Sequence, residues 1–227
     1  YIEEGGGFND ITPLRSTTAA GDVTFAATNG STTITVSDTN HGAVLNDFVE
    51  FSGAATLGGN ITAAILNAEH KVIAVVSSSQ YQIVVSATAN GSDTGNGGSS
   101  VVGKYQINVG LNSQVGGTGW GSSTWGRLGW GSGSSLTTTT NIRLWSHDNF
   151  GEDLIINPRD ANVYYWDKGT GLSARAVELS TLSGAKSAPQ IAKQVLVSDQ
   201  DRHVLAFGCD AINSVSYTHL TLPTIMP

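Results

Sequence analysis

The chain has 227 residues, of which only 13% are charged and 28 are glycine. Its net charge of −7, with 11 scattered basic residues, argues against a general nucleic-acid-binding surface, because phosphate contacts need clustered lysine and arginine. The single cysteine, Cys209, excludes an intramolecular disulfide framework and cysteine-based zinc sites. No apolar run is long enough to span a bilayer. The glycine content and the 39% of hydrophobic residues are typical of an all-β protein with many turns.

The chain opens with a predicted β-hairpin. Residues 1–4 form its first strand, the glycines of 5–7 form the turn, and 8–11 return. The start in the middle of a strand predicts a piece of a longer protein. We assign residues 1–14 to the end of a β-propeller-like blade.

Residues 15–112 differ in composition, being rich in Thr, Ala, Ser and Val and nearly free of Trp. The segment "STTITVSD" alternates apolar residues with threonine, as a half-buried strand does. We expect five or six strands, one short helical turn within 60–71 and a loop at 91–100, which together make a small β-barrel or sandwich inserted in the blade region. Its expected core consists of Ile34, Val36, Val49, Phe51, Val72, Ile73 and Ile83.

Residues 113–140 form a ribbon rich in Gly, Trp and Thr. Trp120, Trp125 and Trp130 lie five apart, so neither a strand nor a helix would gather their rings on one face. Three interpretations remain open: a loop packed over its own core, a contact between subunits, or a platform for glycans. Because Trp-rich segments suit interfaces, our hypothesis is a self-assembly element in which Arg127 stacks on one of the rings.

Residues 141–213 resemble residues 1–14 in composition and strand pattern. We expect strands at 142–145, 154–156 and 163–166, and a later hairpin turning at 200–201. The stretches "YIEEGGGFNDIT" and "YYWDKGTGLSARAVEL" share one plan, an aromatic strand, an acidic residue, a Gly-rich turn and a strand. Repeated hairpins of this kind are typical of propeller blades. The prediction is therefore an all-β chain of partial propeller-like blades, interrupted by the inserted module, with the ribbon as the return crossing.

The last residues, 214–227, lack the glycine richness of the rest. The stretch "VSYTHLTLPT", Val215 to Thr224, resembles a translated sequencing-library adaptor, since GTC TCT TAT ACA CAT CTG ACG CTG CCG ACG encodes these residues in order. We expect the natural sequence to stop near Asn213, and the tail to pack poorly and contribute nothing to the fold.

Each candidate catalytic or metal-binding group also has a structural interpretation, which we favour. His147 and Asp148 could act as a general base with an orienting acid, but no nucleophile motif accompanies them, so we expect a turn at a strand end. The segment 148–153, "DNFGED", offers oxygen ligands for calcium without the regular spacing of a calcium loop, and we expect a solvated turn. His41 and His70 lie far apart without a cysteine or a third histidine, and we expect ordinary turn residues. We predict no catalytic residue, no cofactor and no metal.

The stretches "LWSHDNFGEDLIINPRDANVYYWD" and "IAKQVLVSDQDRHVLAFG" resemble tail proteins of short-tailed bacterial viruses, of the nozzle, hub or DNA-stabilisation type. The opening "YIEEGGGFNDITP" and the segment "HGAVLNDFVEFSGAATLGGNITAAILN" are similar to the same group. The resemblance covers most of residues 1–210. It implies a propeller-like platform that forms a ring around a DNA channel in the virion tail, made in the host cytoplasm.

From this resemblance we expect a virion structural protein without catalysis. Its partners would be copies of itself in a ring, other tail proteins and viral DNA in passage, with no membrane insertion by this chain. The acidic balance fits a conduit that does not hold the passing genome. The alternatives are a glycan-binding adhesin or spike module and, further away, a propeller glycosidase, although the repeated S-x-D-x-G-x-T-W boxes of sialidases are absent.

Overall fold

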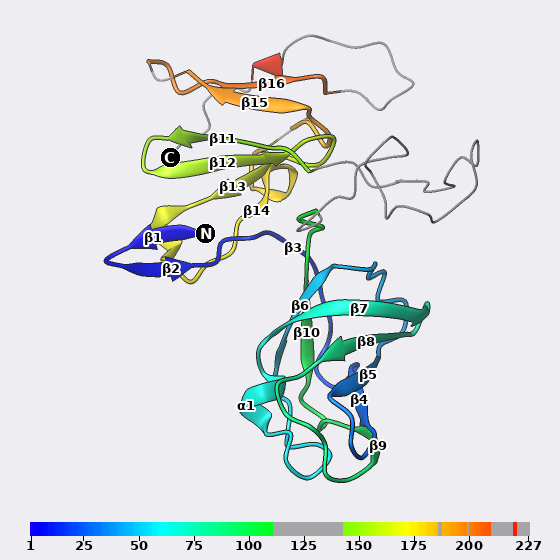
Figure 1. The fold of residues 1–227 in the computed structure, drawn as a ribbon. Coiled ribbons are helices and arrows are strands. Elements are labelled where there is room, and N and C mark those ends of the chain that lie inside the picture. Colours follow the sequence, from blue (N-terminus) through cyan, green and yellow to red (C-terminus); the bar gives the residue numbers. More distant parts are fainter. Residues whose placement is uncertain (111–142, 186–187, 199, 210–219, 222–227) are drawn as a thin grey trace, which may run out of the picture.

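The computed structural model describes residues 1–110, 143–185, 188–198, 200–209 and 220–221 (Figure 1). Within these residues the regular secondary structure is almost all antiparallel strands, which confirms the all-β prediction. The first two, β1 (Ile2–Glu4) and β2 (Gly7–Asn9), form the expected hairpin. Gly5 and Gly6 both have positive φ, at 62° and 81°, a backbone conformation that glycine adopts without strain.

Eight strands then form one sheet in the order β3-β10-β6-β7-β8-β5-β4-β9. We call this part, residues 14–107, the inserted module. The strands β3 and β9 end the sheet without pairing to each other, so the barrel that we considered is not closed. The elements are β3 (Leu14–Thr17), β4 (Thr24–Ala27), β5 (Thr33–Ser37), β6 (Phe48–Ser52), α1 (Ala63–Leu66), β7 (Glu69–Ser77), β8 (Gln80–Val84), β9 (Asp93–Asn96) and β10 (Val102–Gln106).

The sheet folds over itself because β7 belongs to both of its halves. Its first three residues pair with β6, and the rest of the strand, from Val72 on, pairs with β8. The two halves enclose one core, in which the rings of Phe25 and Phe51 meet edge to face at 5.0 Å. This arrangement is a small sandwich whose halves share a bent strand.

Burial alternates along β4, β5 and β6, as expected for strands with one face in a core. Six of the seven expected core residues are buried, but Ile73 is 39% exposed and that assignment is wrong. The register of β7 against β8 shifts between Val72 and Ala74, so Ile73 lies in a bulge. An extra residue in a bulge reverses the side-chain alternation that follows it.

The loop expected at 91–100 is also partly wrong, because residues 93–96 form β9 and pair with β4. The stretch is too rich in Gly, Ser and Asp to show the periodicity of a strand. Its pairing depends on the open edge that β4 offers, which is a property of the tertiary fold. The expected short helical turn is present as α1.

A separate antiparallel sheet has the order β11-β12-β13-β14. Its strands are β11 (Trp145–Phe150), β12 (Asp153–Pro158), β13 (Tyr164–Trp166) and β14 (Val177–Glu178), and two short 3-10 turns, η1 (Lys168–Thr170) and η2 (Leu179–Thr181), adjoin β13 and β14. The strand expected at 142–145 instead begins at Trp145 and runs to Phe150, so His147 and Asp148, which we placed in a turn, lie within it. The turn expected within 148–153 is present at residues 151–152, between β11 and β12.

Both faces of this four-stranded sheet are covered. On one face Ile156 and Trp166 pack with Ile11 of the N-terminal segment. On the other face Ile155 packs with Val195 of the following hairpin. Figure 1 shows the hairpin β1–β2, the four-stranded sheet and the strands β15 and β16 stacked one above another.

The third sheet contains β15 (Gln194–Val197), β16 (Val204–Phe207) and β17 (Leu220–Thr221). The first two strands form the hairpin that we expected. The third lies in the tail, which we expected to pack poorly. Its two residues, Leu220 and Thr221, pair with Ala206 and Leu205 of β16. The other tail residues lie outside the described part of the chain.

Candidate functional site at the module junction

Arg175, in the loop between β13 and β14, joins three parts of the chain. Its Nη1 donates to the carboxylate of Asp10, in the N-terminal segment, and its Nη2 donates to Oε2 of Glu50 on β6 at 3.0 Å. The arginine side chain is 19% exposed. Two charge-assisted hydrogen bonds from one planar guanidinium fix both the distance and the relative orientation of the groups that they join. Arg175 therefore holds the inserted module against the four-stranded sheet.

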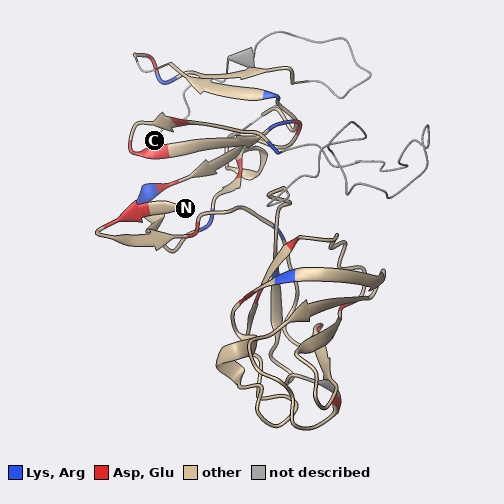
Figure 2. Cartoon of the chain, viewed as in Figure 1, with Lys and Arg blue, Asp and Glu red and all other residues tan. Residues whose placement is uncertain are grey.

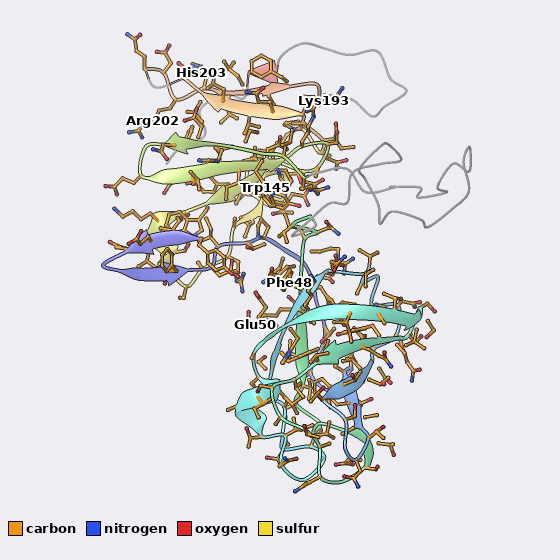
Figure 3. All side chains as sticks on the ribbon, viewed as in Figure 1. Phe48, Glu50, Trp145, Lys193, Arg202 and His203 are labelled. Atoms are coloured by element: carbon orange, nitrogen blue, oxygen red, sulfur yellow. The ribbon has the colours of Figure 1, made fainter. Side chains whose placement is uncertain are left out.

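Gln106, at the end of β10, extends this contact. It is buried, and its Nε2 donates to Oδ2 of Asp10 at 3.3 Å and to the carboxylate of Glu69. The negative charges of Asp10 and Glu69 raise the pKa of the Tyr1 hydroxyl. Figure 3 shows Glu50 on the side of the module that lies toward β1 and β2. We call Asp10, Glu50, Glu69, Gln106 and Arg175 the junction cluster.

Beside the junction cluster lies an open cleft of about 310 Å³. Trp145 and His147 are two residues apart on β11 and therefore point to the same face. Trp145 is 38% exposed. Mainly apolar walls with a few polar groups are typical of sites for small molecules. The cleft is lined by Tyr1, Ile11, Thr12, Pro13, Val109, Trp145, His147, Leu154 and Ile156.

His147 and Asp148 do not form a base with an orienting acid. They are consecutive residues of β11, so their side chains point to opposite faces of the sheet. Oδ2 of Asp148 accepts a hydrogen bond from the backbone N–H of Val197 at 2.8 Å, and Oγ of Ser146 accepts one from Val195 at 3.0 Å. These two side chains connect β11 to β15, and our expectation of a turn at this position is wrong.

The oxygen ligands proposed within 148–153 do not converge either. Asp153 accepts hydrogen bonds from the Tyr165 hydroxyl and from the backbone N–H of Lys168 at 3.0 Å. Burial and the bond to Asp153 raise the pKa of Tyr165. Glu152 is exposed and pairs with Lys168 at 3.6 Å. Within the described residues, no three His, Cys, Asp or Glu side chains are grouped so that they could hold a metal ion.

The two histidines of the module have separate structural roles. In the loop after β5, Nδ1 of His41 accepts a hydrogen bond from the backbone N–H of Ala43 at 2.9 Å, and its Nε2 lies 3.0 Å from the carbonyl oxygen of Ser77. Nε2 of His70 lies 3.2 Å from the carbonyl oxygen of Leu66. His70 is a strand residue of β7, so our expectation of a turn there is wrong.

The module core also contains a chain of buried hydroxyls. Tyr105 donates to Oδ2 of Asp38 at 2.6 Å, and Tyr81 lies 2.9 Å from the Tyr105 oxygen. Since the Tyr105 proton goes to Asp38, Tyr81 is the donor to Tyr105. Burial raises the pKa of both tyrosines. The Arg15 guanidinium lies 5.6 Å from the centre of the Tyr105 ring, where a cation is attracted to the ring face.

The sequence-predicted interface residues, Trp120, Trp125, Arg127 and Trp130, lie outside the described residues. The junction cluster was missed because its members are single charged or amide residues spread over positions 10–175, without a local motif. The aromatic residue at position 145 was visible in the sequence. Its place in a cleft depends on the extent of β11, which the sequence did not indicate.

No protein-family model matches the chain, and no match was found among curated proteins. Within the described residues, no helix has the length and apolar character needed to cross a membrane. Among solved structures the chain is similar to a phage phi92 endosialidase, with a TM-score of 0.32 and 13% identity, over 85% of this chain and 27% of that chain. The chain thus spans about a quarter of the length of that structure.

Proposed function

We propose that this chain is a structural component of a virus particle, belonging to the tail of a short-tailed bacterial virus at its nozzle or hub. In this proposal the stacked sheets are blades of a platform, subunits pack in a ring through which the genome passes, and the inserted module projects from the ring. The protein acts by assembly and not by catalysis. Its partners are copies of itself and other tail proteins.

The observation that carries the proposal is the stack of sheets with the module fastened to it. A four-stranded sheet with both faces covered is a rigid element, since sliding would expose the two cores on its faces. The module leaves and rejoins this region through β3 and β10, which pair with each other. The junction cluster then fixes its direction. Rigid stacked sheets that hold the inserted module in one direction suit a subunit that must contact several neighbouring subunits at once.

The polar groups near β11 support a structural role. The carboxylate of Asp148 and the hydroxyl of Ser146 are engaged by backbone N–H groups of the next hairpin. A general base needs a free acceptor within reach of its substrate. These two groups instead supply the hydrogen bonds that hold neighbouring sheets together.

The test is the assembly state of the protein, measured by mass photometry and negative-stain electron microscopy. We expect closed rings of one stoichiometry. A protein that remains monomeric at every concentration would overturn the proposal.

The cleft favours a second candidate, a glycan-binding module. Trp145 presents an exposed aromatic surface beside an imidazole and the Thr12 hydroxyl. Amphipathic rings at an open site suit a ligand with one apolar face and hydroxyl groups at its edges. Retention on a glycan array that is lost in the Trp145→Ala variant would support this function. Equal retention of the variant, or none by either protein, would exclude it.

A further inference from the structure

The outer face of one half of the module carries no charge. It consists of the outward residues of β4, β5 and β8, together with Ala74 of β7, which pairs with the outward Gln82, and the two unpaired residues Ile73 and Val76. On β8 the side chains of Tyr81 and Ile83 point inward, which leaves Gln82 and Val84 on the outside. In Figure 2 the ribbons of β4, β5 and β8 carry no Lys, Arg, Asp or Glu, and the charged residues of β7, Glu69 and Lys71, lie in its first half. We call it the neutral face, and its residues are Thr24, Ala26, Thr33, Thr35, Ser37, Ile73, Ala74, Val76, Gln80, Gln82 and Val84.

Part of the neutral face is apolar and exposed. Ile73, Val76 and Val84 are each between 39% and 56% exposed. The two register shifts of β7 against β8 put Ile73 and Val76 in bulges, where they have no partner on β8. A solvent-facing sheet normally carries lysine or glutamate, which oppose association. The β-branched side chains without charge on this face favour a contact.

The net charge of the chain restricts which partners can cover the neutral face. Two copies that each carry a net charge of −7 repel one another. Desolvating a charge without a matched partner costs several kcal/mol. A face with no charge avoids both costs at the contact, because nothing on it must be desolvated as an ion. A strongly charged partner, by contrast, would find no opposite charge there.

We propose that the neutral face is a contact between copies of this chain, in which the inserted modules of neighbouring subunits meet. The inference deepens the proposed function and depends on its self-assembly. With strands about 4.8 Å apart and residues rising about 3.3 Å, four strands of five residues give a flat area of about 300 Å². A standard interface buries about 800 Å² on each side. The contact is therefore weak alone and becomes strong when several copies are joined in a ring.

The test uses sedimentation velocity of the full chain over a range of concentrations. The variant Gln80→Glu/Gln82→Glu adds two charges to the neutral face with almost no change of shape. The matched control is Asn29→Asp/Asn60→Asp, which adds the same charge in loops beyond the strands. In both variants an amide becomes a carboxylate, and thermal unfolding measured by circular dichroism verifies that each variant is folded.

We expect reversible association of the wild-type protein, which strengthens as salt rises above about 0.15 M because screening reduces the repulsion. The Gln80→Glu/Gln82→Glu variant should associate at least about tenfold more weakly, and the control should match the wild type. If both variants associate like the wild type, the neutral face is not the contact and self-assembly through another surface stands. If the wild type never associates, this inference and the proposed ring are both overturned.

Discussion

Asp148 joins two sheets through a single carboxylate, and its contribution can be measured. In Asp148→Ala the backbone N–H of Val197 loses its acceptor. A buried donor without a partner costs about 1–3 kcal/mol. We therefore expect the free energy of unfolding in urea to fall by about that amount.

Two variants serve as controls for Asp148→Ala. Asp148→Asn keeps an acceptor oxygen and should be close to the wild type. His147→Ala removes a side chain from the open face of β11 and should change the free energy by less than about 0.5 kcal/mol. A larger loss for His147→Ala than for Asp148→Ala would contradict the structural role assigned to the carboxylate.

The buried pair Tyr81 and Tyr105 makes stability depend on alkaline pH. Burial raises both pKa values above the ordinary value of 10.0 in the folded chain, while the unfolded chain ionises near that value. The stability is complete below about pH 10 and is lost as the pH rises above it, by about 1.4 kcal/mol per pH unit for each tyrosine.

Unfolding in urea between about pH 9 and pH 12 measures this dependence. The Tyr81→Phe variant lacks one of the two titrating groups, so its slope of free energy against pH should be smaller by about 1.4 kcal/mol per unit. The slope is informative even if the variant is less stable at neutral pH. Equal slopes for the variant and the wild type would show that Tyr81 ionises as easily in the folded chain as in the unfolded one.

At the scale of elements, deletion of residues 215–227 tests whether the tail contributes to the stability of the fold. We expect the free energy of unfolding to change by less than about 0.5 kcal/mol. The strand β17 has only two residues, and each ladder hydrogen bond contributes about 1 kcal/mol while ordering one residue costs about as much. A loss of several kcal/mol in chemical denaturation would show that the tail belongs to the native fold.

The Trp-rich ribbon calls for a different experiment. Replacing Trp120, Trp125 and Trp130 with serine should leave folded monomers and prevent assembly, because tryptophans in a Gly-rich sequence favour a contact with another subunit. Circular dichroism and mass photometry report the two properties separately. An unfolded variant would mean that the three rings belong to the core of their own subunit. A variant that assembles normally but no longer binds cells or sugars would favour the adhesin.

The elements differ in how far the sequence could predict them. Strong alternation identified β5, and Gly-rich turns identified the hairpin β1–β2, because both signals are local. The bulge at Ile73 and the strand β9 depend on what the neighbouring strand offers, which local periodicity does not contain. The junction cluster depends on contacts between positions 10 and 175. Such contacts are fixed by the tertiary fold and leave no local pattern.

At the scale of the whole molecule, the described parts of the chain are held together by contacts of three kinds. The N-terminal segment packs through Ile11 on one face of the four-stranded sheet. Ser146 and Asp148 fasten the following hairpin to the other face. Arg175 connects the sheet to the module through Asp10 and Glu50. The chain is therefore a base of stacked sheets to which the module is held in a fixed direction.

The most direct measurement of the central claim is the mass distribution of the purified protein in solution, determined by mass photometry with class averages from electron microscopy. The proposed function predicts one closed ring with a fixed number of subunits, from which the inserted modules project at a single angle. A monomer at all concentrations, or open chains of undefined length, would contradict it.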